Sequence, residues 1–300
     1  MFTQQLINGL ALGAVYALIA LGYTMVYGIL QLINFAHGEV YMLGAYLGII
    51  ILGALTYLGL TAYSLPLSLL IAVFGSAAFC AAYGAAIERI AYRPLRNATK
   101  LAPLISAVGM SIILQNVVML SQGKEYKNLP PMLPSKGITI FGANISPVQI
   151  FILSASILLM IVLHLFVAKT RLGKAMRATS QDRVMAGLVG ININQVISIT
   201  FMIGSALAAV AGVMVTLYYG VAHFFMGYLA GIKAFTAAVL GGIGSIPGAM
   251  LGGFVLGLIE NFCASYVSSV YKDAFAFAVL IITLIIRPAG LLGQKSVDKV

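Results

Sequence analysis

The sequence predicts an all-α polytopic membrane protein, a bundle of about eight or nine transmembrane helices in which segments can be broken or re-entrant. Of its 300 residues, 61% are hydrophobic and only 8% are charged, whereas a soluble domain carries about 25% charged residues. The apolar residues also fall into runs near the ~20 residues that a helix needs to cross the hydrocarbon core. We expect residues 1–300 to form a single membrane domain.

Nine apolar runs follow one another along the chain, at residues 6–30, 38–60, 66–86, 101–120, 148–168, 195–219, 232–243, 248–262 and 274–286. The seventh and eighth runs are short and flank residues 244–248, which contain two Gly and one Pro. This region is therefore either two tilted helices or a broken element buried in protein. The N-terminus lacks the basic region and the cleavage site of a signal peptide, so the first run is expected to remain as a span.

Basic residues predict the orientation of the helices. They cluster at residues 89–100, at residues 169–183 and in the tail from residue 287. Alternate threading of nine spans puts these clusters on one side, which the positive-inside rule makes the cytoplasm. The N-terminus and the Pro-containing loop 123–147 are then periplasmic, and the connection 169–194 and the C-terminus are cytoplasmic. The net charge of +10 comes from basic residues in short loops, so it indicates how the helices are oriented. These residues do not form the basic surface stripe that binds nucleic acid.

No motif in the sequence indicates catalysis or cofactor binding. A Gly-rich nucleotide loop, a Ser nucleophile elbow and a zinc-protease motif are all absent. Cys80 and Cys263 stand alone in apolar runs, so we expect them to be packing residues. The sequence therefore predicts no enzyme, no metal site and no cofactor bound by this chain.

Ionisable residues inside apolar runs are the candidates for a transport role, because a charge at the centre of a span costs ~2.5–3.5 kcal/mol. Asn34, His37 and Glu39 lie together at a break between two runs. They either gate a translocation path or form a structural polar pair at a helix turn. Lys233 and Glu260 lie near the ends of runs, and their side chains either line the path or extend to the water interface.

Small residues at four-residue spacing mark the end of the chain. Gly244, Pro247 and Gly248 lie in a stretch where Gly recurs every four residues, a spacing that lets helices approach closely in lipid. This stretch either packs the bundle or forms a contact that slides as the path opens. Ala36-His37 and Ala222-His223 each precede a stretch rich in Met, Gly and Tyr, which suggests an internal repeat.

Residues 169–194 form a connection with helical character. Val184, Leu188 and Ile191 are spaced to share one face of a helix, with Asp182 and Arg183 beside it. Such an amphipathic helix docks into a groove on a partner protein or lies on anionic lipid. The residues alone leave both alternatives open.

The chain resembles the LivH family, permease subunits of ABC transporters for branched-chain amino acids, over nearly its whole length. The matching stretches are YALIA at 16–20, GYTMVYG at 22–28, INFAHGE at 33–39, IER at 87–89, YRPLR at 92–96, KAFTAAVLGGIGSIPGA at 233–249 and RPAGLLG at 287–293. The resemblance implies a bacterial inner membrane and a second, LivM-like permease subunit. It also implies LivG-like and LivF-like ATPase subunits that use ATP and Mg, and a periplasmic protein that delivers leucine, isoleucine or valine.

In such importers a cytoplasmic coupling helix enters a groove on each ATPase, and residues 184–192 occupy that position here. The resemblance assigns the contact to Asp182, Arg183, Val184, Ala186, Gly187, Leu188, Gly190 and Asn192. The family pattern begins with an acidic residue, which Val184 replaces; the nearest acid is Asp182. An ion-coupled secondary transporter of small apolar solutes is the competing hypothesis, and it needs acidic residues deep in the bundle.

Overall fold

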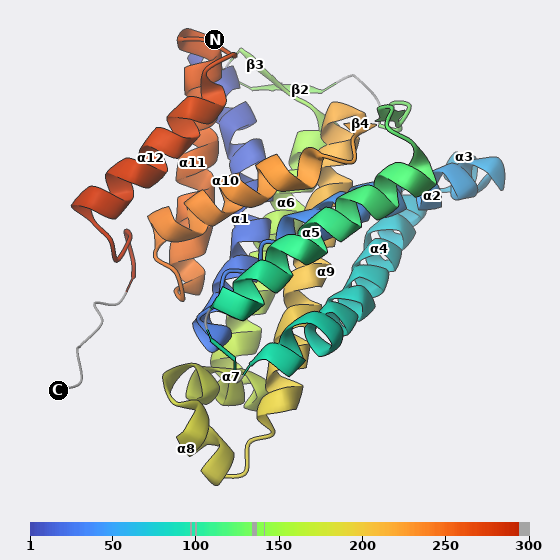
Figure 1. The fold of residues 1–300 in the computed structure, drawn as a ribbon. Coiled ribbons are helices and arrows are strands. Elements are labelled where there is room, and N and C mark those ends of the chain that lie inside the picture. Colours follow the sequence, from blue (N-terminus) through green and yellow to red (C-terminus); the bar gives the residue numbers. More distant parts are fainter. Residues whose placement is uncertain (97, 100, 134–136, 141, 294–300) are drawn as a thin grey trace.

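The chain folds into a helical bundle with short strands at one end (Figure 1). A computed structural model describes residues 1–96, 98–99, 101–133, 137–140 and 142–293. Within these residues, seven helices are long and apolar enough to cross a membrane, and Met226–Gly241 is a shorter apolar helix. The predicted all-α polytopic fold is confirmed. Lys100, Lys136, Lys295 and Lys299, which contribute to the predicted orientation, lie outside the described residues.

The helices are α1 (Phe2–Leu30), α2 (His37–Tyr57), α3 (Leu60–Tyr63), α4 (Leu65–Ile87), α5 (Leu101–Gln122), α6 (Pro147–Lys169), α7 (Arg171–Gln181), α8 (Arg183–Leu188), α9 (Ile193–Tyr219), α10 (Met226–Gly241), α11 (Ile246–Tyr266) and α12 (Lys272–Ile286). A π-helical turn, η1 (Glu88–Tyr92), and a 3₁₀ turn, η2 (Arg93–Leu95), continue α4. Strand β1 (Lys127–Asn128) pairs antiparallel with β4 (Val221–Ala222), and β2 (Ile138–Ile140) with β3 (Ala143–Ile145).

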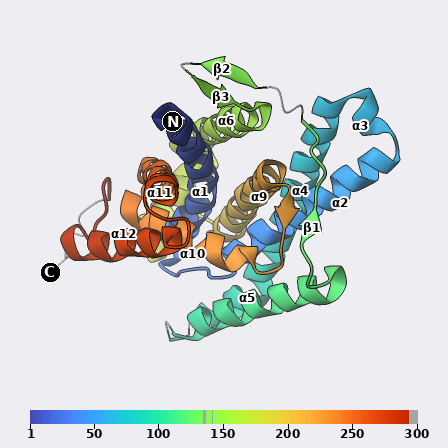
Figure 2. The same ribbon diagram turned by 90° about the horizontal axis from the view of Figure 1, so that it is seen from above.

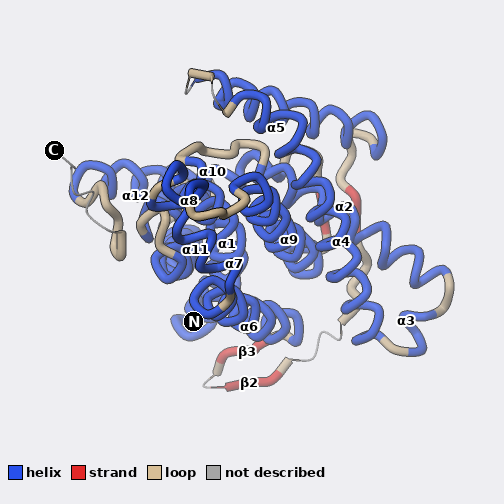
Figure 3. Tube along the Cα trace, turned by 90° about the horizontal axis from the view of Figure 1, so that it is seen from below, coloured by secondary structure: helices blue, strands red, loops and turns tan. Residues whose placement is uncertain are grey.

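The N-terminus and the strands lie at one end of the bundle, and α7 and α8 lie at the other (Figure 1). Figure 3 shows the second end from below, with α7 and α8 in front of α1 and α9. Gln149 at the start of α6 donates to Asn8 near the start of α1 at 2.7 Å and to Tyr218 near the end of α9 at 3.4 Å. Helices α1 and α9 therefore run antiparallel.

Two halves of the chain repeat the same packing in opposite orientations. Helices α1, α2 and α4 of the first half correspond to α9, α10 and α11 of the second. The contact of α1 with α11 corresponds to that of α9 with α4, and the contact of α2 with α9 corresponds to that of α10 with α1. Helices α1 and α9 lie side by side in the middle of the bundle (Figure 2), with Gly22 against Gly204. The units α1–α2–α4–α5 and α9–α10–α11–α12 thus form an inverted repeat, an arrangement typical of transporters.

Each unit contains the same break after its first helix. Gln31 after α1 and Gly220 after α9 are left-handed, with φ of 54° and 73°, and each N–H bonds the carbonyl four residues earlier. Asn34 and His223 then accept a backbone hydrogen bond from the first residue of α2 and of α10. The structural register therefore pairs His223 with Asn34, whereas the sequence similarity paired it with His37.

The two breaks place the starts of α2 and α10 inside the bundle. Gly38 lies against the backbone of Gly227 and Gly231, where any side chain would overlap the opposite helix. Helix α10 is the shorter of the two, since its 16 residues at 1.5 Å each cover roughly 24 Å. The stretch at residues 242–245 is a turn between two helices and not a re-entrant element, since α11 begins at Ile246 and runs for 21 residues.

Candidate functional site

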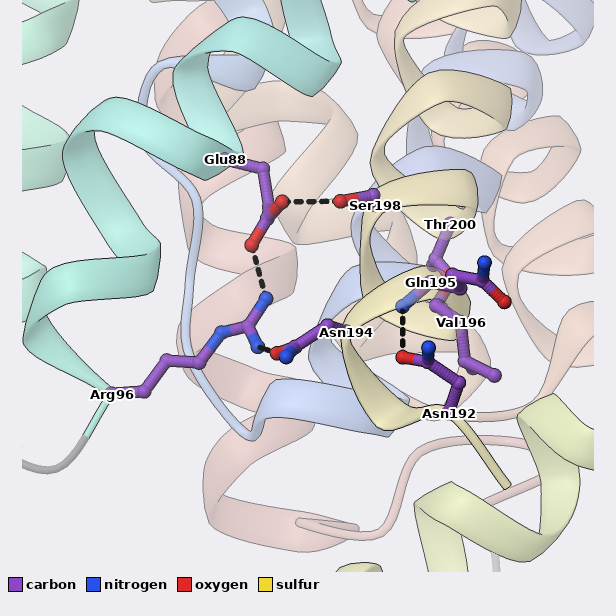
Figure 4. Close-up of polar contacts among 8 residues, drawn as sticks. All are labelled: Glu88, Arg96, Asn192, Asn194, Gln195, Val196, Ser198 and Thr200. Atoms are coloured by element: carbon purple, nitrogen blue, oxygen red, sulfur yellow. Dashed lines mark hydrogen bonds and ion pairs between the residues drawn. The ribbon is translucent and has the colours of Figure 1, made fainter. Parts of the chain in front are cut away.

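Helix α8 is a single short element bounded by a polar cap and a left-handed glycine. The Asp182 carboxylate caps it, since Oδ1 accepts the backbone N–H groups of Val184 at 2.8 Å and Met185 at 3.0 Å. Gly190, with φ of 87°, follows its end. The side chain of Asn192 then caps α9 by accepting the N–H of Gln195 at 3.1 Å (Figure 4).

The outer side of α8 is apolar. Ala186 is only 3% exposed and faces the bundle, whereas Val184 and Leu188 are 73% and 76% exposed. At 3.6 residues per turn, positions two before and two after Ala186 lie on the opposite side of the helix. Exposed Met185 and Val189 extend this surface, and Gly187 adds no side chain to it. We call Val184, Met185, Leu188 and Val189 the α8 face.

The predicted helical face extended to Ile191, and that part is wrong. Helix α8 ends at Leu188, and the left-handed Gly190 turns the chain back toward the bundle. Ile191 is partly buried and packs against the hydrophobic core. The face is therefore one turn shorter than the sequence spacing suggested.

Arg183, the first residue of α8, turns inward and leaves the α8 face. Its Nε donates to the carbonyl of Ile29, in the last turn of α1, at 2.8 Å, and its Nη2 donates to the same oxygen. The last carbonyls of a helix have no partner within the helix, so a cation fits there. Partial burial, together with the nearby charge of Arg96, holds the pKa of Arg183 below its ordinary value.

A polar cluster joins the end of α4 to the start of α9 (Figure 4). Glu88 in the π-helical turn is fully buried; it is paired with Arg96 and accepts a hydrogen bond from Ser198. Arg96 also donates to the Asn194 side chain at 2.6 Å. The cluster fixes the π-helical turn to the first two turns of α9, directly after α8.

The α1–α2 connector, residues 31–36, carries the first group of predicted path residues. The Asn34 side chain is buried and its Oδ1 accepts a hydrogen bond from the Tyr92 hydroxyl at 2.6 Å. His37 Nε2 donates to the Ile19 carbonyl at 3.2 Å, and its ring fills the space beside Gly22. Both residues are thus packed within the bundle at the break.

Glu39 occupies the first turn of α2 and is fully buried. Its Oε1 accepts hydrogen bonds from Gln115 at 2.7 Å and Ser111 at 3.1 Å, both on α5. Its Oε2 has no hydrogen-bond partner among the described residues. Ser111 and Gln115 also line a cavity of about 310 Å³ between α5 and α10, with Tyr23 and Tyr228 on its walls.

The second group of predicted path residues lies at the α10–α11 turn, away from this cavity. Gly244 has φ of 93° and space around it, and Pro247 is exposed in the first turn of α11. Gly248 is buried against the backbone of Gly241, which a side chain would overlap. The geometry of Gly248 fits tight helix packing. The first group of predicted path residues therefore lies at the α1–α2 break and the second at a separate turn between α10 and α11.

The sequence interpretation missed a buried ionic cluster. The Lys233 and Glu260 side chains do not extend to the surface of the protein: they are 6% and 3% exposed and paired at 2.7 Å. Lys233 also pairs with Asp273 at 2.6 Å, and the Tyr16 hydroxyl donates to Glu260 at 2.8 Å. The available signal was one lysine and one acid inside apolar runs, with Asp273 directly before the last run. Within the described residues, no group of three or more His, Cys, Asp or Glu side chains is arranged to hold a metal ion.

Comparisons with known proteins agree along the whole chain. The family described as "Branched-chain amino acid transport system / permease component" matches residues 5–284. The high-affinity branched-chain amino acid transport system permease protein BraD of Pseudomonas aeruginosa is 53% identical, over 100% of this chain and 98% of that protein. The LivH permease proteins of Salmonella typhimurium and Escherichia coli K12 are 50% and 49% identical over the same shares.

Proposed function

Because the chain belongs to the family of branched-chain amino acid transport permeases, we propose that it is the membrane-spanning permease subunit of an ABC importer for leucine, isoleucine and valine. Its partners are a second, LivM-like permease subunit, LivG-like and LivF-like ATPase subunits, and a periplasmic substrate-binding protein. ATP and Mg are used by the ATPase subunits. This chain supplies the path and has no ATPase site of its own.

The α8 face is the observation that carries this proposal. Its four apolar side chains are each more than half exposed, and they point away from the bundle. A helix that lies flat on lipid turns its apolar side toward the bilayer, whereas Ala186 is the α8 residue that faces the bundle. An apolar helix face that projects from the protein fits a groove on a partner. The ATPase is the partner that an importer needs at this position.

We place the α8 end in the cytoplasm of a bacterial inner membrane. Basic residues gather there, on η1, η2 and around α7: Arg89, Arg93, Arg96, Lys169, Arg171, Lys174, Arg177 and Arg183. The positive-inside rule makes such an end cytoplasmic. The N-terminus and the loop 123–147 then face the periplasm. The C-terminal segment joins the cytoplasmic end, since Leu291 and Leu292 bond the last carbonyls of α10.

The translocation path is proposed to run along the cavity between α5 and α10. The break at residues 31–36 and the buried Glu39 lie beside that cavity. Non-helical backbone at membrane depth is tolerated where it is buried or lines a cavity, and broken helices mark binding sites in transporters. His37 and Glu39 are therefore proposed to act in gating. Gly244, Pro247 and Gly248 remain a second, more distant gating proposal at the cytoplasmic turn.

Leu188→Asp tests the function, because a carboxylate buried at the ATPase contact is costly. We expect the complex with this variant to lose the co-purifying ATPase subunits or to hydrolyse ATP without transport. Lys174→Gln is the matched control, since Lys174 is exposed on α7 and lies off the α8 face. Wild-type co-purification and wild-type coupled hydrolysis with Leu188→Asp would move the ATPase contact elsewhere.

The secondary-transporter alternative predicts substrate uptake by this chain without any ATPase. Such a carrier uses acidic residues deep in the bundle as ion sites. Here Glu260 is already neutralised by Lys233 and hydrogen-bonded by Tyr16, which leaves Glu39 as the remaining candidate. Reconstitution of the chain alone separates the two functions, and gradient-driven leucine uptake in that experiment would overturn the importer proposal.

A further inference from the structure

The α1–α2 connector, residues 31–36, is held near one end by α8 and near the other by the π-helical turn η1. One contact lies at the end of α1, just before Gln31, and the other lies at Asn34, just before α2 begins. The connector itself is neither helix nor strand and includes the left-handed Gln31. Movement of either contact therefore shifts the position of the first turn of α2.

The first contact is the bidentate hydrogen bond from Arg183 to the Ile29 carbonyl. In α8, Ala186 is the buried residue, so the guanidinium supplies much of the attachment of this helix to the bundle. It joins α8 to the last turn of α1 without any intervening side chain. A displacement of α8 that keeps this bond pulls on the carbonyl two residues before Gln31.

The second contact reaches Asn34 through the polar cluster at the end of α4. Asn194 and Ser198, in the first turns of α9, bind Arg96 and Glu88. Glu88 opens the π-helical turn and Tyr92 closes it, so the two side chains are parts of one element. The Tyr92 hydroxyl then donates to Asn34, and both side chains are buried. π-Helical turns often occur at functional sites.

We propose that Arg183 and Tyr92 are positioning residues that carry the movement of α8 into the α1–α2 connector, and through it to His37 and Glu39 at the start of α2. The proposal rests on the proposed docking of an ATPase on the α8 face. In this proposal Arg183 transmits the movement of α8 and does not itself bind the ATPase. It also gives Tyr92, which lies away from the α8 face, a part in coupling.

The buried bond between Tyr92 and Asn34 is a sharp point for a test. Tyr92→Phe removes one hydroxyl and leaves the ring, which packs against Phe201. The Asn34 oxygen then loses its donor in a buried site. Arg183→Met removes the bond to Ile29 and keeps the apolar stem of the side chain. Arg183→Lys retains the charge with a single donor group, and we expect it to restore part of the coupling.

The experiment uses the complete complex with its ATPase subunits and binding protein in proteoliposomes. We measure leucine imported per ATP hydrolysed. We expect this ratio to fall about threefold or more in Tyr92→Phe, which loses one hydrogen bond, and in Arg183→Met, which loses both donors to Ile29. The ATPases should co-purify at wild-type levels. A second measurement follows maleimide labelling of Gln31→Cys in a Cys263→Ser background, with and without ATP. The nucleotide-dependent change in rate should shrink in both variants.

Two matched controls remove neighbouring hydrogen bonds that do not touch the connector. Ser106 donates to the Ala91 carbonyl at 3.0 Å, beside Tyr92, so Ser106→Ala is the control for Tyr92→Phe. Arg177 binds the Val167 carbonyl in the last turn of α6, so Arg177→Met is the control for Arg183→Met. We expect both controls to retain the wild-type transport ratio and labelling response.

The outcomes separate this proposal from the function on which it rests. Wild-type ratios and labelling responses in both Tyr92→Phe and Arg183→Met would overturn the relay while the importer stands. If Arg183→Met loses the ATPases, the relay is tested by Tyr92→Phe alone, because Tyr92 lies away from α8 and its replacement leaves the docking surface intact. Wild-type co-purification together with wild-type coupled hydrolysis in Leu188→Asp would instead refute docking on the α8 face.

Discussion

Replacing Lys233 with methionine should destabilise the bundle, because this lysine is the cation shared by two carboxylates on different helices. Lys233 lies on α10, Glu260 on α11 and Asp273 on α12. Its removal leaves the Glu260 carboxylate, 3% exposed, without a counter-charge. Loss of one partner of a buried ion pair costs about 3–5 kcal/mol. That is a change on the order of 10² to 10⁴ in the folded-to-unfolded ratio.

Most of this cost should come from Glu260. The Asp273 side chain is 36% exposed, and partly exposed pairs contribute little after solvent screening. Adding Glu260→Gln to Lys233→Met removes the uncompensated charge, and the amide oxygen can still accept the Tyr16 hydroxyl. We therefore expect the double variant to recover most of the stability that the single variant loses.

The assay is the fraction of folded protein in detergent as sodium dodecyl sulfate is increased. Lys272→Met is the matched control, since Lys272 is an exposed lysine at the start of α12. Lys233→Met should unfold at a lower dodecyl sulfate fraction than wild type or the control. Equal unfolding of all three proteins, or a double variant no more stable than Lys233→Met, would refute the assignment of a stabilising buried pair.

Three further predictions concern the predicted site residues. His37→Ala and Glu39→Gln should impair uptake while the complex still assembles, and wild-type uptake in both would return these residues to a purely structural role. Gly248→Leu should reduce the yield of folded protein, because the leucine side chain would overlap the backbone of α10. Gly109 has open space around it, so Gly109→Leu should leave the yield unchanged. Equal yields of the two variants would contradict close packing at Gly248. Asn192→Ala should cost about 1 kcal/mol by removing the cap of α9, seen as a lower detergent-unfolding midpoint, and an unchanged midpoint would show that the cap contributes nothing.

Local patterns predicted most of the helices, because a span needs a minimum length of apolar residues. They failed where a residue's environment is set by a distant partner. The predicted eighth span stopped at Phe262, yet α11 runs to Tyr266, and the Glu260 side chain is buried there by Lys233 on α10. Arg183 belonged to the expected docking helix, but a carbonyl of α1 draws it inward.

The candidate site shows the same limit. Helical spacing placed Val184 and Leu188 on one face, as the structure has them, because their relation depends only on the turn of one helix. The contact between Tyr92 and Asn34 spans 58 positions in the chain, and no local pattern marks it. The register of the two breaks is also a backbone property, since it depends on the left-handed Gln31 and Gly220 and not on matching side chains.

Helix α8 lies in the segment that joins the two inverted units, and neither unit contains it. Duplication of the unit therefore doubles the breaks and the crossing helices of a chain, but not this element. In the proposed transporter, the LivG-like and LivF-like ATPase subunits offer two grooves, one on each subunit. One copy of this chain fills one of them, so the stoichiometry of the proposed transporter requires a second membrane subunit with a docking helix of its own.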